Sequence, residues 1–165
     1  MNADVFSQEK RSQIMSRIRA KDTKPEKTVR SLLHKLGYRF RLHVATLPGK
    51  PDIVLPKYKT VIFVHGCYWH RHNGCKNTTT PTKNRDLWVN KFNDNIARDQ
   101  RNRTELEQLG WVVIIIWECK IKADPVLAVV NSLIDKGILE KNTTYPELSS
   151  GEIESVAEKK FESSW

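Results

Sequence analysis

Residues 51–75 read PDIVLPKYKTVIFVHGCYWHRHNGC, and no other stretch of the chain holds so many chemically reactive side chains. Its two runs PDIVL and TVIFV are rich in β-branched residues, so they predict two strands joined by a tight connection. Asp52 opens the first strand and His65 follows the second. Neighbouring strands hold a carboxylate and an imidazole at one end of a sheet more rigidly than a loop could. We therefore interpret this end of the strands as the centre of a functional site.

Length and charge limit the classes of protein to which this chain can belong. A chain of 165 residues is long enough for one domain with a sizeable core. The net charge of +9 favours a polyanionic partner, and between Lys10 and Arg41 eleven Lys or Arg stand against two acids. From Glu140 onward six Glu stand against three Lys. We predict one domain over residues 1–140, with a basic N-terminal helix that faces phosphate, and an acidic, partly disordered tail over 141–165.

The sequence also bears on the compartment. The first ten residues, MNADVFSQEK, contain no apolar signal region, and the apolar run at 111–117 is far too short to cross a bilayer. We expect a cytoplasmic protein that does not act at a membrane. In that compartment the three cysteines are expected to be free or bound to metal rather than paired in disulfides.

Four segments carry the signals of helices. The clearest is a capping box, Thr23-x-x-Glu26, whose helix is expected to end at Gly37. The longest is expected to form two helices with a break near 93–95, because an unbroken helix of that length is uncommon. The helical segments are predicted over residues 7–19, 24–36, 83–109 and 125–134.

Strands are predicted between these helices, at residues 38–42, 51–55, 60–64 and 111–117. The last of them, WVVIIIW, is apolar throughout, which is typical of a strand buried on both faces. It follows a helical crossover, so at least one strand pair is expected to be parallel. The sequence thus predicts an α/β fold with a central mixed β-sheet of about four strands flanked by helices on both faces.

Cysteine and histidine form a second pattern in the same region. Cys67-x4-His72-x2-Cys75 offers three metal ligands in one short loop. Cys119, just beyond the last predicted strand, can supply a fourth. Four protein ligands make a closed, structural Cys3His zinc site. The spacing leaves open whether His70 or His72 is the ligand, and three unrelated thiols are the alternative.

Two stretches carry a resemblance to a known family. GKPDIVLPKYKTVIFVHGCYWHRHNGC at 49–75 and NIARDQRNRTELEQLGWVVIIIWEC at 95–119 resemble the very short patch repair (Vsr) endonucleases. These enzymes nick DNA beside T:G mismatches left by deamination of 5-methylcytosine. The resemblance extends from about residue 8 to about residue 120, and the HGC-aromatic-WH stretch is its most distinctive part.

The resemblance implies a fold related to the PD-(D/E)XK nucleases. Pro51-Asp52 then carries the first carboxylate of that motif. Where the wider superfamily has an acid-x-Lys, this chain has Phe63-Val64-His65, so the second carboxylate and the lysine are absent.

Roles of single residues also follow from the resemblance. Asp52 is implied to bind two Mg²⁺ ions, with the backbone carbonyl of Val64 assisting at one of them. His70 corresponds to the general base, and Asp99 orients it. The remaining members of the catalytic set match Glu26 and His65.

Local structure offers simpler explanations for several of these side chains. Asp52 can serve as a turn carboxylate after Pro51, and Glu26 already has a role in its capping box. Asp99 is equally explained as an exposed charge on a helix, and His65 as a strand-end imidazole bonded to the backbone.

The resemblance further implies a wedge that enters the DNA stack beside the mismatch. Tyr68 and Trp69 match its aromatic members, and Met15 in the N-terminal helix matches a methionine. Unstacking a base step costs a few kcal/mol, least at a mismatch that is already weakened, so insertion itself gives selectivity. For Met15 packing in a core is the alternative.

The resemblance implies a monomeric T:G mismatch DNA endonuclease, dependent on sequence context, that nicks the strand 5′ of the mispaired thymine. It would use two Mg²⁺ and one structural Zn²⁺ and initiate repair of deaminated 5-methylcytosine. We expect it at the bacterial nucleoid, in functional association with a cytosine-5 methyltransferase. Two alternatives remain: a restriction-like endonuclease of the same fold that cuts paired DNA, and a zinc-containing DNA-binding module without activity.

Overall fold

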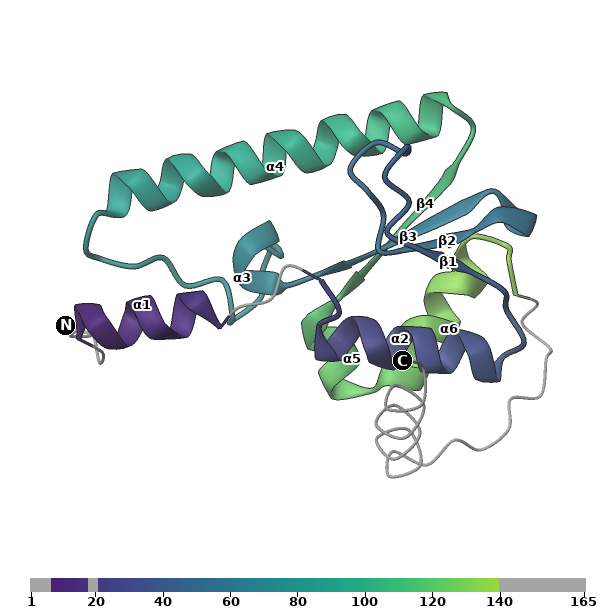
Figure 1. Cartoon of the computed structure of the whole chain (residues 1–165), viewed down its shortest axis with the longest axis horizontal. Helices are drawn as coiled ribbons and strands as arrows, with labels where there is room; N and C mark the ends of the chain where they lie inside the picture. Colours follow the sequence, from purple (N-terminus) through teal and green to yellow (C-terminus); the bar gives the residue numbers. More distant parts are fainter. Residues whose placement is uncertain (1–6, 18–20, 140–165) are drawn as a thin grey trace.

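A computed structural model describes residues 7–17 and 21–139, and Figure 1 shows the arrangement of its elements. The acidic segment 141–165 predicted to be a tail lies outside these residues. No helix in the described part of the chain is long and apolar enough to span a membrane. The elements are α1 (Gln8–Ser16), α2 (Lys24–Lys35), β1 (Arg41–Leu42), β2 (Ile53–Leu55), η1 (Pro56–Tyr58), β3 (Thr60–His65), α3 (Cys67–His70), α4 (Arg85–Gln108), β4 (Val112–Trp117), α5 (Glu118–Ala123) and α6 (Pro125–Asp135).

The four strands form one mixed sheet in the order β1-β2-β3-β4. β1 pairs antiparallel with β2, β2 antiparallel with β3, and β3 parallel with β4. The parallel pair is joined through α3 and α4, as expected of a crossover connection. The predicted mixed α/β architecture is therefore confirmed.

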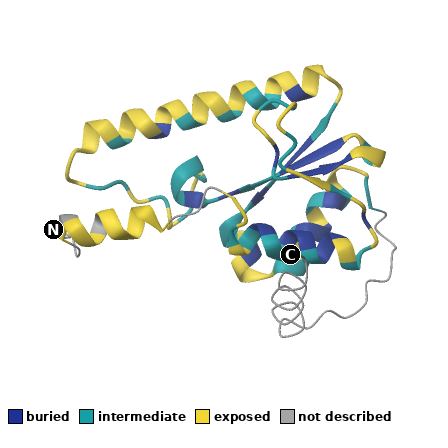
Figure 2. Ribbon diagram, viewed as in Figure 1, coloured by how far each residue is buried: buried dark blue, intermediate teal, exposed yellow. Residues whose placement is uncertain are grey.

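Helices cover both faces of this sheet, because alternate strand residues point to opposite sides. Ile53, Ile62 and Ile114 pack against α2, α5 and α6 in the larger core cluster. Val61 and Val113 face the other way and pack with Leu106 of α4. Figure 2 shows the consequence: burial is concentrated in the sheet and in α2 and α6, whereas α1 and most of α4 are exposed.

The first two helices begin where their caps predict. The Ser7 hydroxyl accepts the N–H of Lys10, and the Thr23 hydroxyl accepts the N–H of Glu26. α1 is described as far as Ser16, short of the predicted end, and residues 18–20 are outside the described chain.

The predicted break in the long helical segment is wrong, since α4 runs without interruption from Arg85 to Gln108. Asparagine is a weak helix former, but the region near 93–95 holds neither proline nor glycine. Phe92 and Leu106 are buried on one side, and the Asn95 side chain donates to the Trp69 carbonyl at 3.1 Å. Tertiary contacts therefore keep α4 continuous.

The predicted strand at 38–42 is shorter than expected, because only Arg41 and Leu42 pair with β2. Tyr38 turns inward and is buried: its ring meets Tyr58 edge-on at 5.3 Å, and its hydroxyl donates to the Ile138 carbonyl at 3.3 Å. Burial of this ring removes it from the strand. The short helices α3 and α5 were not predicted, while α6 ends one residue beyond the predicted boundary.

Candidate active site

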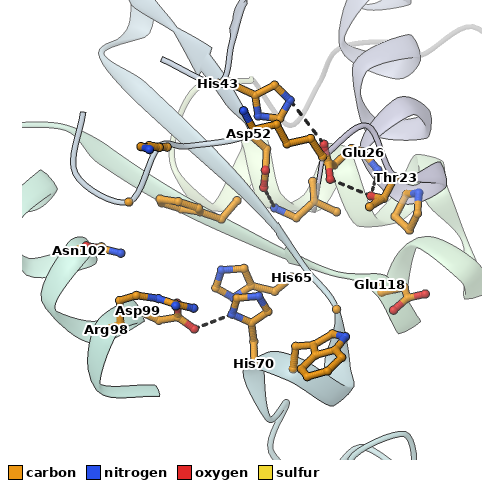
Figure 3. Close-up of a pocket in the computed structure, with 18 of the residues that line it drawn as sticks. Thr23, Glu26, His43, Asp52, His65, His70, Arg98, Asp99, Asn102 and Glu118 are labelled. Atoms are coloured by element: carbon orange, nitrogen blue, oxygen red, sulfur yellow. Dashed lines mark hydrogen bonds and ion pairs between the residues drawn. The ribbon is translucent and has the colours of Figure 1, made fainter. Parts of the chain in front are cut away.

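A cleft opens at the end of the sheet where β2 begins and β3 ends. Its volume is about 1090 Å³, and α2, α3, α4 and the loop before β2 contribute to its walls. Because β2 and β3 are antiparallel, Asp52 and His65 lie at the same end of the sheet, as the sequence predicts (Figure 3). The cleft also receives Glu26, His70 and Asp99.

Asp52 is held by the neighbouring strand. Its Oδ2 accepts the backbone N–H of Val64 at 2.8 Å, so the carboxylate lies beside the main chain at the predicted second metal contact. Burial raises the pKa of Asp52 to about 6; the Val64 N–H opposes this rise and the negative charge of Glu26 adds to it. A cation in the cleft would favour the ionised form. The carboxylate and a main-chain carbonyl are the hard oxygen donors that suit Mg²⁺, which keeps waters and phosphate oxygens as its other ligands.

Glu26 is buried at the start of α2, and both oxygens of its carboxylate accept hydrogen bonds. Oε1 accepts the hydroxyl of Thr23 at 2.8 Å, and Oε2 accepts the backbone N–H of Asp22 at 3.0 Å. Oε2 also accepts a bond from Arg30 at 2.9 Å. Glu26 thus belongs to its capping box and lines the cleft at the same time.

On the opposite wall two histidine rings stack. The rings of His65 and His70 lie 3.8 Å apart at 9°. Burial lowers the pKa of His65 to about 3, and the charge of His70 adds to the effect, so His65 is neutral near pH 7. His70 Nδ1 is 2.6 Å from Asp99 Oδ2.

The bond to Asp99 decides which nitrogen of His70 is free. Burial acts to raise the pKa of Asp99, but the hydrogen bond and charge of His70 together bring it below its ordinary value. An ionised carboxylate only accepts, so Nδ1 of His70 carries the proton and Nε2 can take one. The pair therefore has the geometry of a general base with its orienting acid.

The four predicted zinc ligands gather next to the cleft. Donor atoms of Cys67, His72, Cys75 and Cys119 all lie within 4.8 Å of one another. His72 Nδ1 is 3.7 Å from the Cys67 sulfur and 3.3 Å from the Cys119 sulfur. Ligands of a tetrahedral zinc ion lie about 3.5–3.8 Å apart, so the donor set fits the metal.

Two further features of this cluster agree with a metal. Burial raises the pKa of the Cys67 thiol to about 12, a penalty that a bound cation would reverse. The His72 ring stacks on Trp117 at 4.2 Å and 9°, so its orientation is fixed. His72 lies in the cluster, whereas His70 faces Asp99, so of the two histidines only His72 is placed to share a metal with the three thiols.

An aromatic group flanks the cleft. Tyr68 and Trp69 meet edge-on at 5.0 Å, and Tyr68 packs against Phe92 at 5.2 Å. Trp88 approaches both predicted wedge residues, with ring centroids 6.2 Å from each. Met15 is 40% exposed on α1 and is not among the residues that line the cleft. Trp88 was not predicted to belong to this group, although its spacing of four from Phe92 puts both residues on one helix face.

Charged residues behind Glu26 were also missed. Arg30 is buried and pairs with both Glu26 and Asp22, while His43 joins the group from the loop before β2. The i,i+4 spacing of Glu26 and Arg30 was a signal for their ion pair, but nothing local indicates its burial.

Comparison with known proteins gives consistent matches. The family model described as DNA mismatch endonuclease Vsr matches residues 3–77. The type II nicking enzyme V.XorIIP of Xanthomonas oryzae pv. oryzae is 50% identical over 118 residues, 72% of this chain and 86% of that protein. V.NmeAIP, a type II nicking enzyme of Neisseria meningitidis, is 48% identical over 119 residues, 72% and 84% of the two chains.

The DNA mismatch endonuclease Vsr of Escherichia coli is 42% identical over 120 residues, 73% of this chain and 76% of that enzyme. Matches at this level over most of both chains confirm the resemblance seen in residues 49–75 and 95–119. The chain belongs to the Vsr family of DNA mismatch endonucleases.

Proposed function

We propose that this protein is a Mg²⁺-dependent endonuclease that nicks duplex DNA on the 5′ side of the mispaired thymine in a T:G mismatch, within a preferred sequence context. Membership of the family and the names of its relatives support a DNA endonuclease. The observation that carries the finer proposal is one cleft in which Asp52 and the His70–Asp99 pair face each other beside Trp69.

Asp52 and the carbonyl of Val64 would hold the metal ions at the end of β3. Bound there, Mg²⁺ supplies Lewis-acid stabilisation of the phosphate and its leaving oxygen. The Val64 N–H bond fixes the Asp52 carboxylate, so it needs no reorganisation when substrate arrives. This use of one carboxylate and a main-chain oxygen is a variant of the PD-(D/E)XK arrangement.

His70 would take the proton of the attacking water through Nε2. Asp99 holds the required tautomer through its 2.6 Å bond to Nδ1. His65, neutral and stacked on His70, keeps that ring from turning and adds no charge beside it. Glu26 lines the other side of the cleft and can accept a hydrogen bond from a water there.

The Cys67–His72–Cys75–Cys119 cluster would bind one structural zinc ion. Cys119 belongs to α5, directly after the edge strand β4. Cys67 is the first residue of α3, and His72 and Cys75 follow that helix. The metal would therefore fasten the segment that carries Trp69 and His70 to the sheet, which positions both for the reaction.

Tyr68 and Trp69 would insert beside the mismatch, supported by Trp88 and Phe92, with Met15 entering from α1. Ring packing in this group reduces the rotamer freedom of the wedge before DNA binds. We further propose that the protein acts as a monomer in the cytoplasm. It would be functionally associated with a cytosine-5 methyltransferase, because the mismatches arise by deamination of 5-methylcytosine.

The test of mismatch recognition is Trp69→Ala. If the ring stacks on an unstacked base, the variant loses about 1–3 kcal/mol of affinity for a T:G duplex and almost none for the same duplex with C:G. Binding to the paired duplex depends on phosphate contacts, which the change does not touch. The measurement is the dissociation constants of the parent and of Trp69→Ala for the T:G and the C:G duplex, all at one salt concentration.

Trp111 provides the matched control, because it packs on the core cluster of Val54 and Leu106. Trp111→Ala should lower the melting temperature and leave the preference for T:G unchanged. Equal losses of affinity on both duplexes in Trp69→Ala, together with lower stability, would mean that Trp69 only packs.

A second prediction concerns Asp99→Asn. An amide no longer enforces the Nδ1–H tautomer of His70, so the nicking rate at saturating Mg²⁺ should fall about 10- to 100-fold, while the affinity for T:G duplex stays the same. Single-turnover nicking and a binding titration measure both quantities. Glu105→Gln, an exposed acid later in α4, is the control and should nick at the parent rate. A parent-like rate for Asp99→Asn would remove Asp99 from the mechanism.

A further inference from the structure

Behind the cleft wall formed by α2 lies a group of four charged or ionisable residues that the proposed mechanism does not use in full. Arg30 and Glu26 are buried, with side-chain exposures of 2% and 4%, and Asp22 and His43 lie at 51% and 19%. Figure 3 shows Glu26 and His43 close to Asp52 on this side of the cleft. Arg30 does not line the cleft itself.

The guanidinium of Arg30 lies at the centre of this group. Its Nη1 donates to Asp22 Oδ1 at 2.5 Å, and its Nη2 donates to Glu26 Oε2 at 2.9 Å. Nη2 is also 2.9 Å from His43 Nε2. Since a guanidinium can only donate, Nε2 of His43 is the acceptor in this contact.

Asp22, Glu26 and His43 would otherwise resemble a cation site. One ligand atom from each lies within 4.8 Å of the others. Arg30 bonds to all three, so its fixed positive charge already occupies the place that a metal ion would take. The group is closed to a metal, and its carboxylates are compensated before Mg²⁺ or DNA arrives.

The same bonds limit what Glu26 can do. Its two oxygens offer about four acceptor positions. Three are taken, by the Thr23 hydroxyl, the Asp22 N–H and the Arg30 guanidinium. The orientation of the Glu26 side chain is therefore fixed, with one acceptor position left. That position suits a single water in the cleft and not a bidentate metal contact.

Stability alone is a poor explanation of this arrangement. Arg30 Nε is buried without a hydrogen-bond partner among the described residues, and a buried ion pair is often no more stable than apolar side chains of the same size. Asp22 has φ of 56°, a left-handed conformation, and in it directs its N–H at Glu26. The unpartnered Arg30 Nε and the left-handed backbone of Asp22 both cost free energy. They indicate that the arrangement serves to orient the Glu26 carboxylate and not to stabilise the fold.

We propose that Arg30 is a positioning residue of the active site: its guanidinium acts as a permanent internal cation that fixes Glu26 with one free acceptor position toward the cleft. His43 and Asp22 hold the guanidinium in plane by bonding its two terminal nitrogens. The inference rests on the proposed endonuclease function and deepens it.

The decisive experiment is a double-mutant cycle of Arg30→Lys with Glu26→Gln, read by single-turnover nicking of a T:G duplex at saturating Mg²⁺. A lysine keeps the charge but is a point donor that cannot bond three partners in one plane. Arg30→Lys is expected to lower the rate at least tenfold, with the dissociation constant for the duplex within twofold of the parent. In the Glu26→Gln background the same change should cost less than twofold, because Arg30 acts through Glu26.

Chemical rescue of a variant that lacks the guanidinium is a second, independent test. Arg30→Ala leaves a cavity of guanidinium size, so millimolar ethylguanidinium should raise both its melting temperature and its nicking rate, the rate at least tenfold. The parent should not respond. Ethylguanidinium should still raise the melting temperature of Arg30→Ala/Glu26→Gln, but not its rate. Lys57→Ala, which removes an exposed charge at the opposite end of β2, controls for net charge and should match the parent.

Each outcome is decisive. If Arg30→Lys lowers the rate by the same factor in the parent and in the Glu26→Gln background, Arg30 is merely structural. A parent-like rate of Arg30→Lys would also overturn the inference. Should Arg30→Ala fail to fold, the lysine cycle alone decides. A parent protein that does not nick the T:G duplex would refute the proposed function instead, whereas a parent that nicks with Arg30→Lys unaffected would leave that function intact.

Discussion

Asp52→Asn is expected to abolish nicking while binding of a T:G duplex persists. Asp52, directly before the first residue of β2, is the carboxylate that would hold Mg²⁺. Metal stabilisation of a phosphoryl transition state is worth several kcal/mol. Each 1.36 kcal/mol is a tenfold change, so the rate should fall on the order of 10³-fold or more. The phosphate contacts expected of the basic residues between Lys10 and Arg41 do not involve Asp52, so the affinity for DNA should persist.

The check is single-turnover nicking together with a binding titration at fixed salt. Asp135→Asn, an exposed acid at the end of α6, is the matched control and should behave as the parent does. Near-parental nicking by Asp52→Asn would contradict its assignment as a metal ligand.

The same variant should be more stable than the parent in Mg²⁺-free buffer. Burial raises the pKa of Asp52 from 3.8 to about 6, so the folded protein carries an unfavourable charge above that pH. The shift corresponds to about 2 kcal/mol after partial solvent screening. The gain from Asp52→Asn should be full above about pH 6, shrink as the pH falls through that value, and vanish below 3.8, where Asp52 is protonated in both the folded and the unfolded parent. Urea unfolding at pH 7 and pH 4 measures it, and an equal difference at both would show that the charge is not its cause.

Loss of a proposed zinc ligand is expected to have the largest effect on stability. A structural zinc site contributes roughly 10–16 kcal/mol to the folding of small zinc domains. Cys119 joins α5 to the 67–75 segment through the cluster, so Cys119→Ser should reduce bound zinc and cost several kcal/mol of unfolding free energy. Domains have only roughly 5–15 kcal/mol in total, so the variant should be marginally folded at 37 °C.

Zinc content by atomic absorption and thermal unfolding test this together. His72→Asn should behave like Cys119→Ser, and His34→Asn, an exposed histidine on α2, should match the parent in both measurements. Full zinc content with an unchanged melting curve in Cys119→Ser would exclude that thiol as a ligand.

Local features of the fold were predictable because their interactions are close in sequence. The capping box of Thr23 and Glu26 involves residues three apart, and it starts α2 where predicted. The β-branched runs became β2 and β3, and their antiparallel pairing brought Asp52 and His65 to one end of the sheet.

Other features depend on residues far apart in sequence. Asn95 bonds to the Trp69 carbonyl, and this contact between α4 and α3 accompanies the continuous helix that propensity alone argued against. Tyr38 leaves the strand pattern because its ring has a buried partner in Tyr58. Trp88 joins the aromatic group only because α4 passes over α3.

The sequence by itself determined the family, the mixed α/β architecture and the set of chemically competent side chains, since residue types and short spacings carry that information. The tertiary structure decided which histidine faces which partner: His72 lies with the thiols and His70 with Asp99, although only two positions separate them. It also decided that Arg30 is buried between Asp22, Glu26 and His43. Such choices depend on the direction of side chains across packed elements, and periodicity along one element cannot specify them.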